Sequence, residues 1–197
     1  MYLFKIHSSP LGNVQYCSVP SGEAFLQIRK STVIGFGGSS TGRGIFTLKP
    51  IPPGTWITSY APTAPFHLAR STSSSDYILR TVRNNTAVQV DGALCPLGLG
   101  KIIQDGSFPL IIAQEKFGSL VKSRLNCEWV NREGEIWFKS TRAIRAGEEL
   151  FTRYTRDNSY WTVQYTSEQL QAIKTALMSA PGSSLEDAER VIRRIKL

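Results

Sequence analysis

The sequence predicts a mainly β chain followed by a helical cap at the C-terminus. Short runs of β-branched and aromatic residues are separated by Gly, Pro, Ser and Asn at intervals of roughly eight to twelve residues, which is typical of short strands joined by turns. Apolar residues at helical spacing are confined to the C-terminal part. Because the strand signals come first and the helical signals last, we expect a β-rich core followed by helices.

Five segments carry the strand pattern. In the segment 55–60, Trp56, Thr58 and Tyr60 alternate, so one aromatic side of this strand is expected to be buried. Pro52 and Pro53 restrict the backbone before Gly54 and predict a turn in front of it. The expected strands are GIFTL (44–48), TWITSY (55–60), YILRTV (77–82), TAVQV (86–90) and EIWFK (135–139).

Two helices are expected at the C-terminus. Thr166 and Gln169 have the spacing of a capping box, and Leu170, Ile173 and Leu177 follow at helical spacing. After the break SAPGSS (179–184), Ser183 with Glu186 is expected to open a second helix. Its apolar stripe is Leu185, Ala188, Val191, Ile192 and Ile195, and its basic residues are Arg190, Arg193 and Arg194. A docked helix with solvated charges is one interpretation, and a contact with nucleic acid or membrane is the other.

Composition narrows the class of protein. The chain has 197 residues, of which 41% are hydrophobic and 19% charged, as in a single globular domain. It contains no run of about 20 apolar residues, and its N-terminus lacks the pattern of a secretion signal, so an intracellular protein is expected. Three dispersed cysteines predict neither a disulfide framework nor a zinc site. The net charge of +8 favours anionic partners or simply solubility.

Two blocks of sequence resemble the first and last conserved blocks of SET-domain protein lysine methyltransferases. The first lies in residues 31–60 and consists of Gly42, Arg43, Gly44, Ile45, Phe46, Ile51, Gly54 and Tyr60. The second lies in residues 134–161 and consists of Arg142, Ile144, Gly147, Glu148, Glu149, Leu150, Tyr154, Tyr160 and Trp161. A Gly-x-Gly pair alone is weak evidence, whereas a Gly-Glu-Glu-Leu turn with a tyrosine four residues later and a Tyr-Trp pair is specific.

The middle of the chain departs from the family pattern. Gln104 and Asp105 stand where the family usually has Asn and His, and Leu125 and Asn126 stand where Pro and Asn are usual. Extra residues, FPLIIAQEKFGSLVK, lie between these motifs, and the sequence leaves open whether the segment 107–124 folds as a lid. The cysteine clusters found beside many SET domains are absent, so the C-terminal helices are expected to complete the substrate side.

The resemblance implies a fold of several small sheets with a threaded C-terminal segment, an exception to the rule that chains avoid knots. It divides the chain into an N-terminal extension of short strands (1–30), a SET-like catalytic domain (31–161) and a C-terminal helical region (162–197). It implies transfer of a methyl group from S-adenosylmethionine to a lysine of a protein, with a histone as the expected substrate and the nucleus as the expected location.

This chemistry requires a neutral amine aligned with the methyl group. The pKa of lysine is about 10.4 in water, and a narrow apolar tunnel disfavours the ammonium form. Aromatic walls exclude water while attracting cationic groups. Tyrosine hydroxyls and backbone carbonyls accept weak contacts from a polarised methyl group. A cluster of tyrosines and a tryptophan near residue 160 is therefore interpreted as the wall of a methyl-transfer tunnel.

The resemblance assigns roles to individual residues. Tyr154 is expected beside the transferred methyl group, as the catalytic residue. The expected cofactor-binding residues are Arg43, Gly44, Gln104, Asp105, Tyr160 and Trp161, and the expected substrate-binding residues are Tyr77 and Trp161. Asn126 is expected to anchor the threaded segment. For each tyrosine and tryptophan, plain burial in the core is the alternative interpretation.

Two other functions are compatible with the sequence. The departures at residues 104, 105 and 125 and the long insertion favour a SET-like interaction module without catalysis. The basic C-terminal helix favours a nucleic-acid-binding protein, although no recognition motif is present. Acidic residues that could attract a basic peptide are Asp76, Asp91, Asp105, Glu115, Glu128 and Glu133, and their arrangement is not evident from the sequence.

Overall fold

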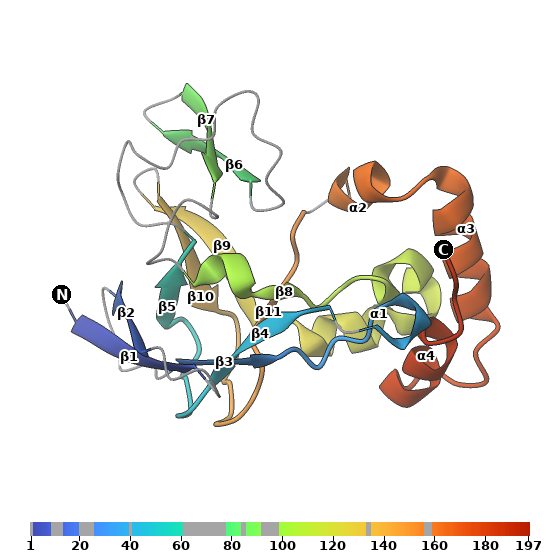
Figure 1. Ribbon diagram of the computed structural model, residues 1–197, viewed down its shortest axis with the longest axis horizontal. Coiled ribbons are helices and arrows are strands. Elements are labelled where there is room, and N and C mark those ends of the chain that lie inside the picture. The colour runs from blue at the N-terminus through green and yellow to red at the C-terminus, as the bar shows by residue number, and fades with distance from the viewer. Residues whose placement is uncertain are drawn as a thin grey trace.

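The computed structural model describes residues 2–8, 14–19, 26–39, 41–60, 78–83, 86–91, 99–132, 135–155 and 159–197. In 2–8, 14–19, 78–83 and 86–91, and at Arg132, it describes the backbone alone. Figure 1 shows small sheets on one side of the molecule and a group of helices on the other, with two short strands, β8 and β11, between them.

A four-stranded sheet contains the Gly-x-Gly strand of the first conserved block. Its order is β2-β1-β3-β4, formed by β1 (Tyr2–Ser8), β2 (Val14–Val19), β3 (Leu26–Lys30) and β4 (Arg43–Thr47). β1 and β3 are parallel, whereas β3 and β4 are antiparallel with Lys30 opposite Arg43. Residues 26–30 therefore extend the same sheet as the Gly-x-Gly strand.

The other strands form three small sheets. β5 (Trp56–Ser59), β10 (Glu135–Ser140) and β9 (Cys127–Arg132) form an antiparallel sheet in that order. β6 (Ile78–Arg83) and β7 (Thr86–Asp91) form a hairpin, and β8 (Gln104–Asp105) pairs in parallel with β11 (Phe151–Thr152). All five segments predicted as strands contain strands. The sequence predicted that one side of β5 is buried, but both sides are buried. Ile57 and Thr58 point to opposite faces, and both are fully buried.

The helical part contains more helix than the sequence predicts. Its elements are η1 (Phe36–Gly38), η5 (Leu110–Ala113), α1 (Gln114–Arg124), α2 (Ser159–Gln164), α3 (Ser167–Met178) and α4 (Leu185–Ile192), whereas η4 (Gly100–Ile102) packs on the strand core through Ile102. The several small sheets and the C-terminal helices are confirmed, but the expectation of a mainly β chain understates the helix. Both α1 in the inserted segment and α2 around the Tyr-Trp pair were missed.

Capping explains where the C-terminal helices begin. Thr166 accepts from the backbone N–H of Gln169, and the Gln169 side chain accepts from the Thr166 N–H at 2.9 Å, which is the predicted capping box. The second helix begins one residue later than predicted. Ser184, not Ser183, is its N-cap, because the Ser184 hydroxyl accepts from the N–H of Asp187 at 3.1 Å.

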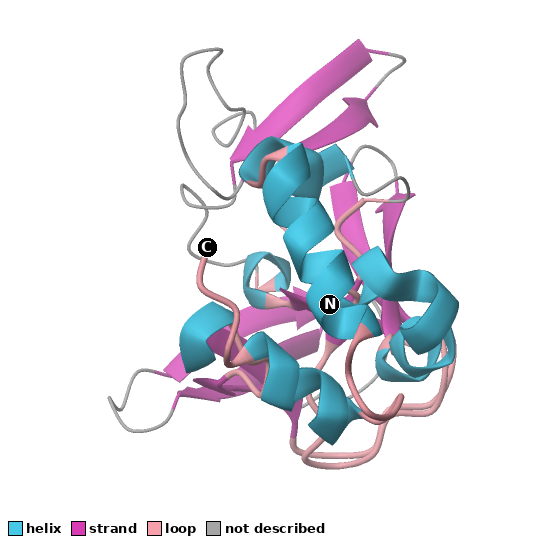
Figure 2. Ribbon diagram, turned by 90° about the vertical axis from the view of Figure 1, so that its right-hand side faces the viewer, coloured by secondary structure: helices cyan, strands magenta, loops and turns pink. Residues whose placement is uncertain are grey.

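The inserted segment builds a second hydrophobic core. Phe117 on α1 and Leu110 on η5 are fully buried against Ile173 and Leu177 of α3. The side chain of Lys116 donates to the carbonyls of Met178 and Ala180, at the end of α3. Figure 2, seen from the helical side, shows these helices gathered in front of the strands. Residues 107–124 thus pack as a core element beneath the C-terminal helices.

α4 docks by its apolar stripe. Ala188 and Ile192 are buried, while Arg190 pairs with Asp187 at 3.3 Å and Arg193 pairs with Glu189 at 3.6 Å. This matches the interpretation of a docked helix with solvated charges. Among the described residues, no helix is long and apolar enough to cross a bilayer.

Candidate functional site

The site forms where β8 lies beside β11. Gln104 is opposite Phe151 and Asp105 is opposite Thr152, and the N–H of Gly106 donates to the Thr152 carbonyl at 2.9 Å. A Cβ at Gly106 would lie 2.7 Å from the Cβ of Phe151, so glycine is required for this approach. The two departures from the family pattern, Gln104 and Asp105, therefore lie directly beside the last conserved block.

Asn126 holds the last block in place. This fully buried residue donates from Nδ2 to the Glu149 carbonyl at 2.7 Å and accepts at Oδ1 from the Phe151 N–H at 2.8 Å. Its own N–H donates to the Phe151 carbonyl at 3.1 Å. These bonds agree with the anchoring role expected for Asn126, and they need no proline at the preceding position.

Glu149 connects the last block to the first. Its buried carboxylate accepts from the Ser31 hydroxyl at 2.7 Å, the Thr32 N–H at 2.7 Å and the Thr32 hydroxyl at 2.6 Å. A Cβ on Gly44 would lie 1.9 Å from Glu149 Oε1, so Gly44 is required for packing on this carboxylate. Ser31 and Thr32 were missed, because no local pattern indicates a partner more than a hundred residues away.

Glu148 stabilises the same turn from outside. It pairs with Arg142 at 2.5 Å and accepts from the Arg145 N–H at 2.9 Å and from Asn126 Nδ2 at 3.3 Å. Burial is the largest single influence on its pKa and acts to raise it. Together, the hydrogen bonds from Arg142, Arg145 and Asn126 lower the pKa by more than burial raises it. The pKa of Glu148 therefore lies below its ordinary value.

Gln104 and Arg43, both expected at the cofactor, meet in the structure. The Gln104 side chain donates from Nε2 to the Arg43 carbonyl at 2.7 Å. This bond joins β8 to the first residue of β4 and brings the Gly-x-Gly strand to the site. The Arg43 side chain is exposed.

Asp105 is buried at the centre of the site, with 4% of its surface exposed. One carboxylate oxygen accepts from the Ser107 N–H at 2.7 Å, the Ser107 hydroxyl at 2.5 Å and the Phe108 N–H at 3.3 Å. The other accepts from the Tyr154 N–H and from the indole N–H of Trp161, each at 3.1 Å. The carboxylate is therefore compensated by five donors.

The Tyr154 hydroxyl faces a backbone carbonyl. It donates to the carbonyl oxygen of Ile103, the residue before Gln104, at 3.1 Å. Burial first, then the charge of Asp105 and the neighbouring Tyr160 and Tyr60, raise the pKa of Tyr154, so the hydroxyl keeps its proton at neutral pH. The Ile103 carbonyl and Tyr60, which was expected to be mainly structural, are parts of this environment that the sequence did not reveal.

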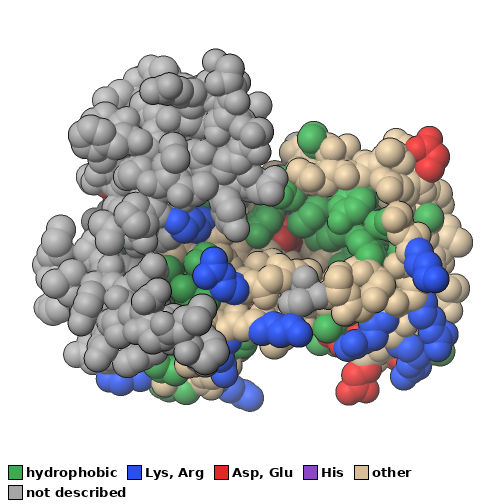
Figure 3. Space-filling model, in the orientation of Figure 1, with side chains coloured by type: hydrophobic (Ala, Val, Ile, Leu, Met, Phe, Trp, Pro, Cys, Tyr) green, Lys and Arg blue, Asp and Glu red, His purple; other side chains and the backbone are tan. Residues whose placement is uncertain are grey.

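Aromatic rings line the site on the helical side. Trp161 lies nearly parallel to Tyr154, with ring centres 5.9 Å apart, and Tyr160 is perpendicular to both. Phe108 stacks on Trp161 at 3.9 Å, and Tyr165 stacks on Phe108 at 5.3 Å. Tyr154, Tyr160, Trp161 and Tyr165 are only half-buried. Figure 3 shows hydrophobic side chains gathered in a hollow between α2 and β4.

The structure thus brings together seven of the eight residues predicted for the site: Arg43, Gly44, Gln104, Asp105, Tyr154, Tyr160 and Trp161. Tyr77 lies outside the described residues. Phe108 and Tyr165 were missed, although both rings extend the aromatic wall. Their signal in the sequence is weak, because isolated aromatic residues more often indicate a core.

Comparison with known proteins identifies one family. Residues 42–155, more than half of the chain, match the family model described as SET domain. A solved structure, the methyltransferase domain of human PR domain-containing protein 2, aligns with 18% sequence identity and a TM-score of 0.46, over 66% of this chain and 76% of that chain. Among curated proteins, no sequence matches this chain.

Proposed function

Because the chain belongs to the SET-domain family, we propose that it is a protein lysine N-methyltransferase that uses S-adenosylmethionine. One observation carries the proposal. The Tyr154 hydroxyl and the Ile103 carbonyl meet at 3.1 Å beside a half-buried aromatic wall. A tyrosine kept protonated in such a place can orient a small cationic group without itself becoming charged.

The residues present fit S-adenosylmethionine. The half-buried rings of Tyr160 and Trp161 offer faces to an adenine or to a sulfonium. The β4 backbone at Arg43 and Gly44 lies against Gln104, so these three residues would hold the rest of the molecule. When bound, S-adenosylmethionine supplies an electrophilic methyl group on a positively charged sulfur.

The chain's own residues then prepare the amine. Tyr154, Tyr160 and Trp161 surround the site with apolar ring surface, which excludes water and lowers the pKa of an entering lysine. The Tyr154 hydroxyl donates its hydrogen bond to the Ile103 carbonyl and keeps its lone pairs to accept weak C–H contacts. Alignment by such fixed groups lowers the barrier by removing the need to orient the reactants.

A histone is the first substrate to test, and a nuclear location is proposed with it. The SET-domain family supports a protein lysine as the acceptor. A basic histone tail would be attracted by an acidic surface next to the site. In the described part of the chain, the acidic residues named from the sequence do not form such a surface. Asp105 is buried inside the site, Glu115 pairs with Lys174 at 2.9 Å, and Glu128 is exposed on β9. A peptide library with lysine in varied contexts is therefore needed beside histones.

Two measurements test the proposed function. Calorimetric titration of the whole chain with S-adenosylmethionine should give micromolar binding. Methylation of histones or of the peptide library should occur with wild type and should fall about a hundredfold with Tyr154→Phe, because the ring remains but the oriented oxygen is lost. Tyr154→Phe should still bind the cofactor, which separates loss of chemistry from loss of the site. A wild-type chain that binds but transfers no methyl group contradicts the proposal.

The interaction module without catalysis is the second candidate. It is favoured by the environment of Asp105, whose two oxygens are both engaged by protein donors. A chain that gives no heat with S-adenosylmethionine at high concentration, yet unfolds cooperatively, would support this candidate.

A further inference from the structure

We propose that Asp105 is a positioning residue, which sets the aromatic wall of the site by holding the indole of Trp161. Its effect on methyl transfer rests on the function proposed above, while its effect on Trp161 does not. The proposal replaces the expectation that Asp105 contacts the cofactor.

The carboxylate of Asp105 is saturated by donors from the protein. Ser107 and Phe108 provide three donors to Oδ1, and the Tyr154 N–H and the Trp161 indole provide two donors to Oδ2. A carboxylate offers about four lone-pair sites, so five donors leave none for a ligand. Asp105 acts on the site through the groups that it holds.

The groups that Asp105 holds come from three different segments. Tyr154 follows β11, Trp161 lies on α2, and Ser107 begins the inserted segment. α2 has only six residues, too few to be stable as an isolated helix, so its place depends on side-chain contacts. The bond from Trp161 to Asp105 ties this short helix to the centre of the site.

The bond to Asp105 also fixes the orientation of the indole. Stacking between Phe108 and Trp161, at 3.9 Å and 15°, sets the plane of the indole but allows it to turn or slide within that plane. The indole N–H points along the ring plane, so its bond to Asp105 removes this freedom. The part of the Trp161 ring that lies beside Tyr154, with ring centres 5.9 Å apart, is thereby fixed.

Replacing Asp105 by asparagine distinguishes its two sets of hydrogen bonds, those at Oδ1 and those at Oδ2. The amide oxygen of Asp105→Asn can still accept from Ser107 and Phe108. The amide NH₂ would then face the Tyr154 N–H and the Trp161 N–H, which are also donors. The variant should therefore release Trp161 while keeping the 105–108 turn.

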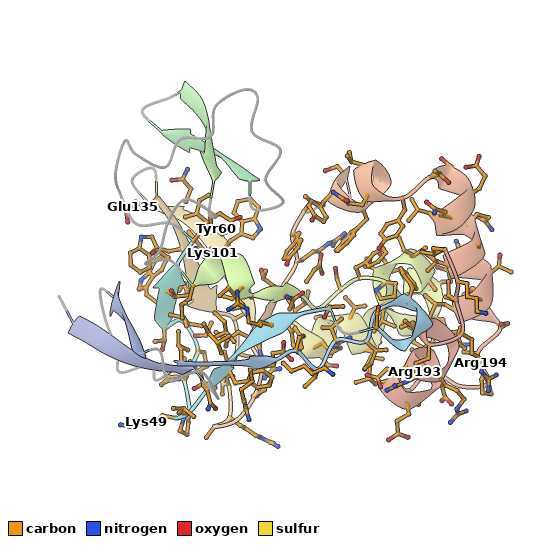
Figure 4. All side chains as sticks on the ribbon, in the orientation of Figure 1. Lys49, Tyr60, Lys101, Glu135, Arg193 and Arg194 are labelled. Carbon is orange, nitrogen blue, oxygen red and sulfur yellow. The ribbon has the colours of Figure 1, made fainter. Side chains whose placement is uncertain are left out.

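A matched control exists elsewhere in the molecule. The Trp137 indole donates to Glu135 Oε2 at 2.8 Å, which is the same chemical pair on β10. Figure 4 shows Glu135 on the left, in the strand part of the molecule and away from the C-terminal helices. Glu135→Gln should disturb the Trp137 indole and leave Trp161 unchanged.

The test reads the indole N–H signals of the four tryptophans by ¹⁵N NMR, with Trp161 assigned through Trp161→Phe. In Asp105→Asn, the Trp161 indole proton should move upfield and exchange with water about tenfold faster, as expected for loss of a charge-assisted hydrogen bond. Glu135→Gln should leave this signal in place. A folded Asp105→Asn chain with an unchanged Trp161 signal overturns the proposal.

A binding measurement adds a second variant, Trp161→Phe, which removes the indole N–H without changing Asp105. Trp161→Phe keeps a stacked ring and loses only the N–H and part of the ring surface, and it should weaken S-adenosylmethionine binding about tenfold. Asp105→Asn should weaken binding to the same extent, and the double variant should be no weaker than Trp161→Phe alone. Glu135→Gln should bind within about twofold of wild type.

The outcomes separate the two proposals. A wild-type chain that binds no S-adenosylmethionine overturns the proposed function, and the indole signals still decide the role of Asp105. A wild-type chain that binds and methylates, with Trp161→Phe binding equally well, overturns only the positioning role.

Discussion

Single residues in this chain act by joining segments that are far apart in the sequence. Glu149 illustrates the point, because its carboxylate binds Ser31 and Thr32 and also occupies the space beside Gly44. The sequence predicted that Gly44 and Glu149 belong to conserved blocks. It did not reveal that the glycine is needed beside the carboxylate, since that requirement arises only when β4 and the last block pair.

Replacing Gly44 by alanine should destabilise the fold. The new Cβ would lie 1.9 Å from Glu149 Oε1, and Glu149 cannot move without breaking its bonds to Ser31 and Thr32. Urea unfolding should show a loss of about 1–3 kcal/mol, as for other overpacked sites. Gly118→Ala is the control. Its Cβ would meet only Gln114 Cγ at 3.4 Å, and alanine in a helix should raise stability by up to about 1 kcal/mol. Equal stability of Gly44→Ala and wild type would contradict the packing role.

The Arg142–Glu148 pair should make stability depend on pH. Because the folded pKa of Glu148 is lowered, the pair contributes fully above the ordinary value of 4.5 and is lost as the pH falls through the lowered folded value. Wild type should exceed Glu148→Gln in free energy of unfolding at neutral pH, by no more than about 1 kcal/mol for this partly exposed pair. The difference should shrink as the pH falls below 4.5 and should vanish once the pH is below the lowered folded pKa. A difference that stays constant from neutral to acid pH would contradict this role of the pair.

At the scale of elements, local signals predicted some helices and missed others. α3 was predicted because its capping box and apolar spacing are both local to the sequence. α1 was missed because Ala113, at its N-cap, makes no side-chain capping bond, and Gly118 lies within it. The helix is instead stabilised by burial of Phe117 and Val121, which requires α3 to be in place.

Lys116 should contribute to the docking of α1 on α3. Its Nζ donates to the carbonyls of Met178 and Ala180, which the end of the helix leaves without partners of their own. Lys116→Met keeps the apolar stem and should lower stability by about 1–2 kcal/mol in urea unfolding. Lys122→Met makes the same change at an exposed position of α1, and its stability should stay within about 0.5 kcal/mol of wild type. Equal effects of the two variants would exclude a specific role for Lys116.

At the scale of the whole molecule, the chain has two hydrophobic cores that meet at the site. One is formed by the strands, with Ile45, Ile57 and Leu150, and the other by the inserted segment and the C-terminal helices. Sequence reasoning placed the conserved blocks correctly because their spacing is a property of the family. It could not place the second core, since the partners of the inserted segment lie some sixty residues further along the chain.

The family match ends at residue 155, yet the site should not survive without the C-terminal helices. Removing residues 166–197 would expose Leu110 and Phe117, which α3 buries, and would leave η1 without α4 beside Phe36. Phe108 packs in the same core and also stacks on Trp161, so loss of the core should loosen the aromatic wall. We expect the truncated chain to be cleaved rapidly by protease within 107–124 and to lose S-adenosylmethionine binding, although residues 42–155 are intact.

Arg193→Ala combined with Arg194→Ala provides the control for this truncation. Both side chains lie at the exposed end of the helical part (Figure 4), and their removal leaves the apolar stripe of α4 unchanged. This variant should resist protease like wild type and bind the cofactor equally well. A truncated chain that keeps its protease resistance and its cofactor binding would show instead that the strand core alone builds the site.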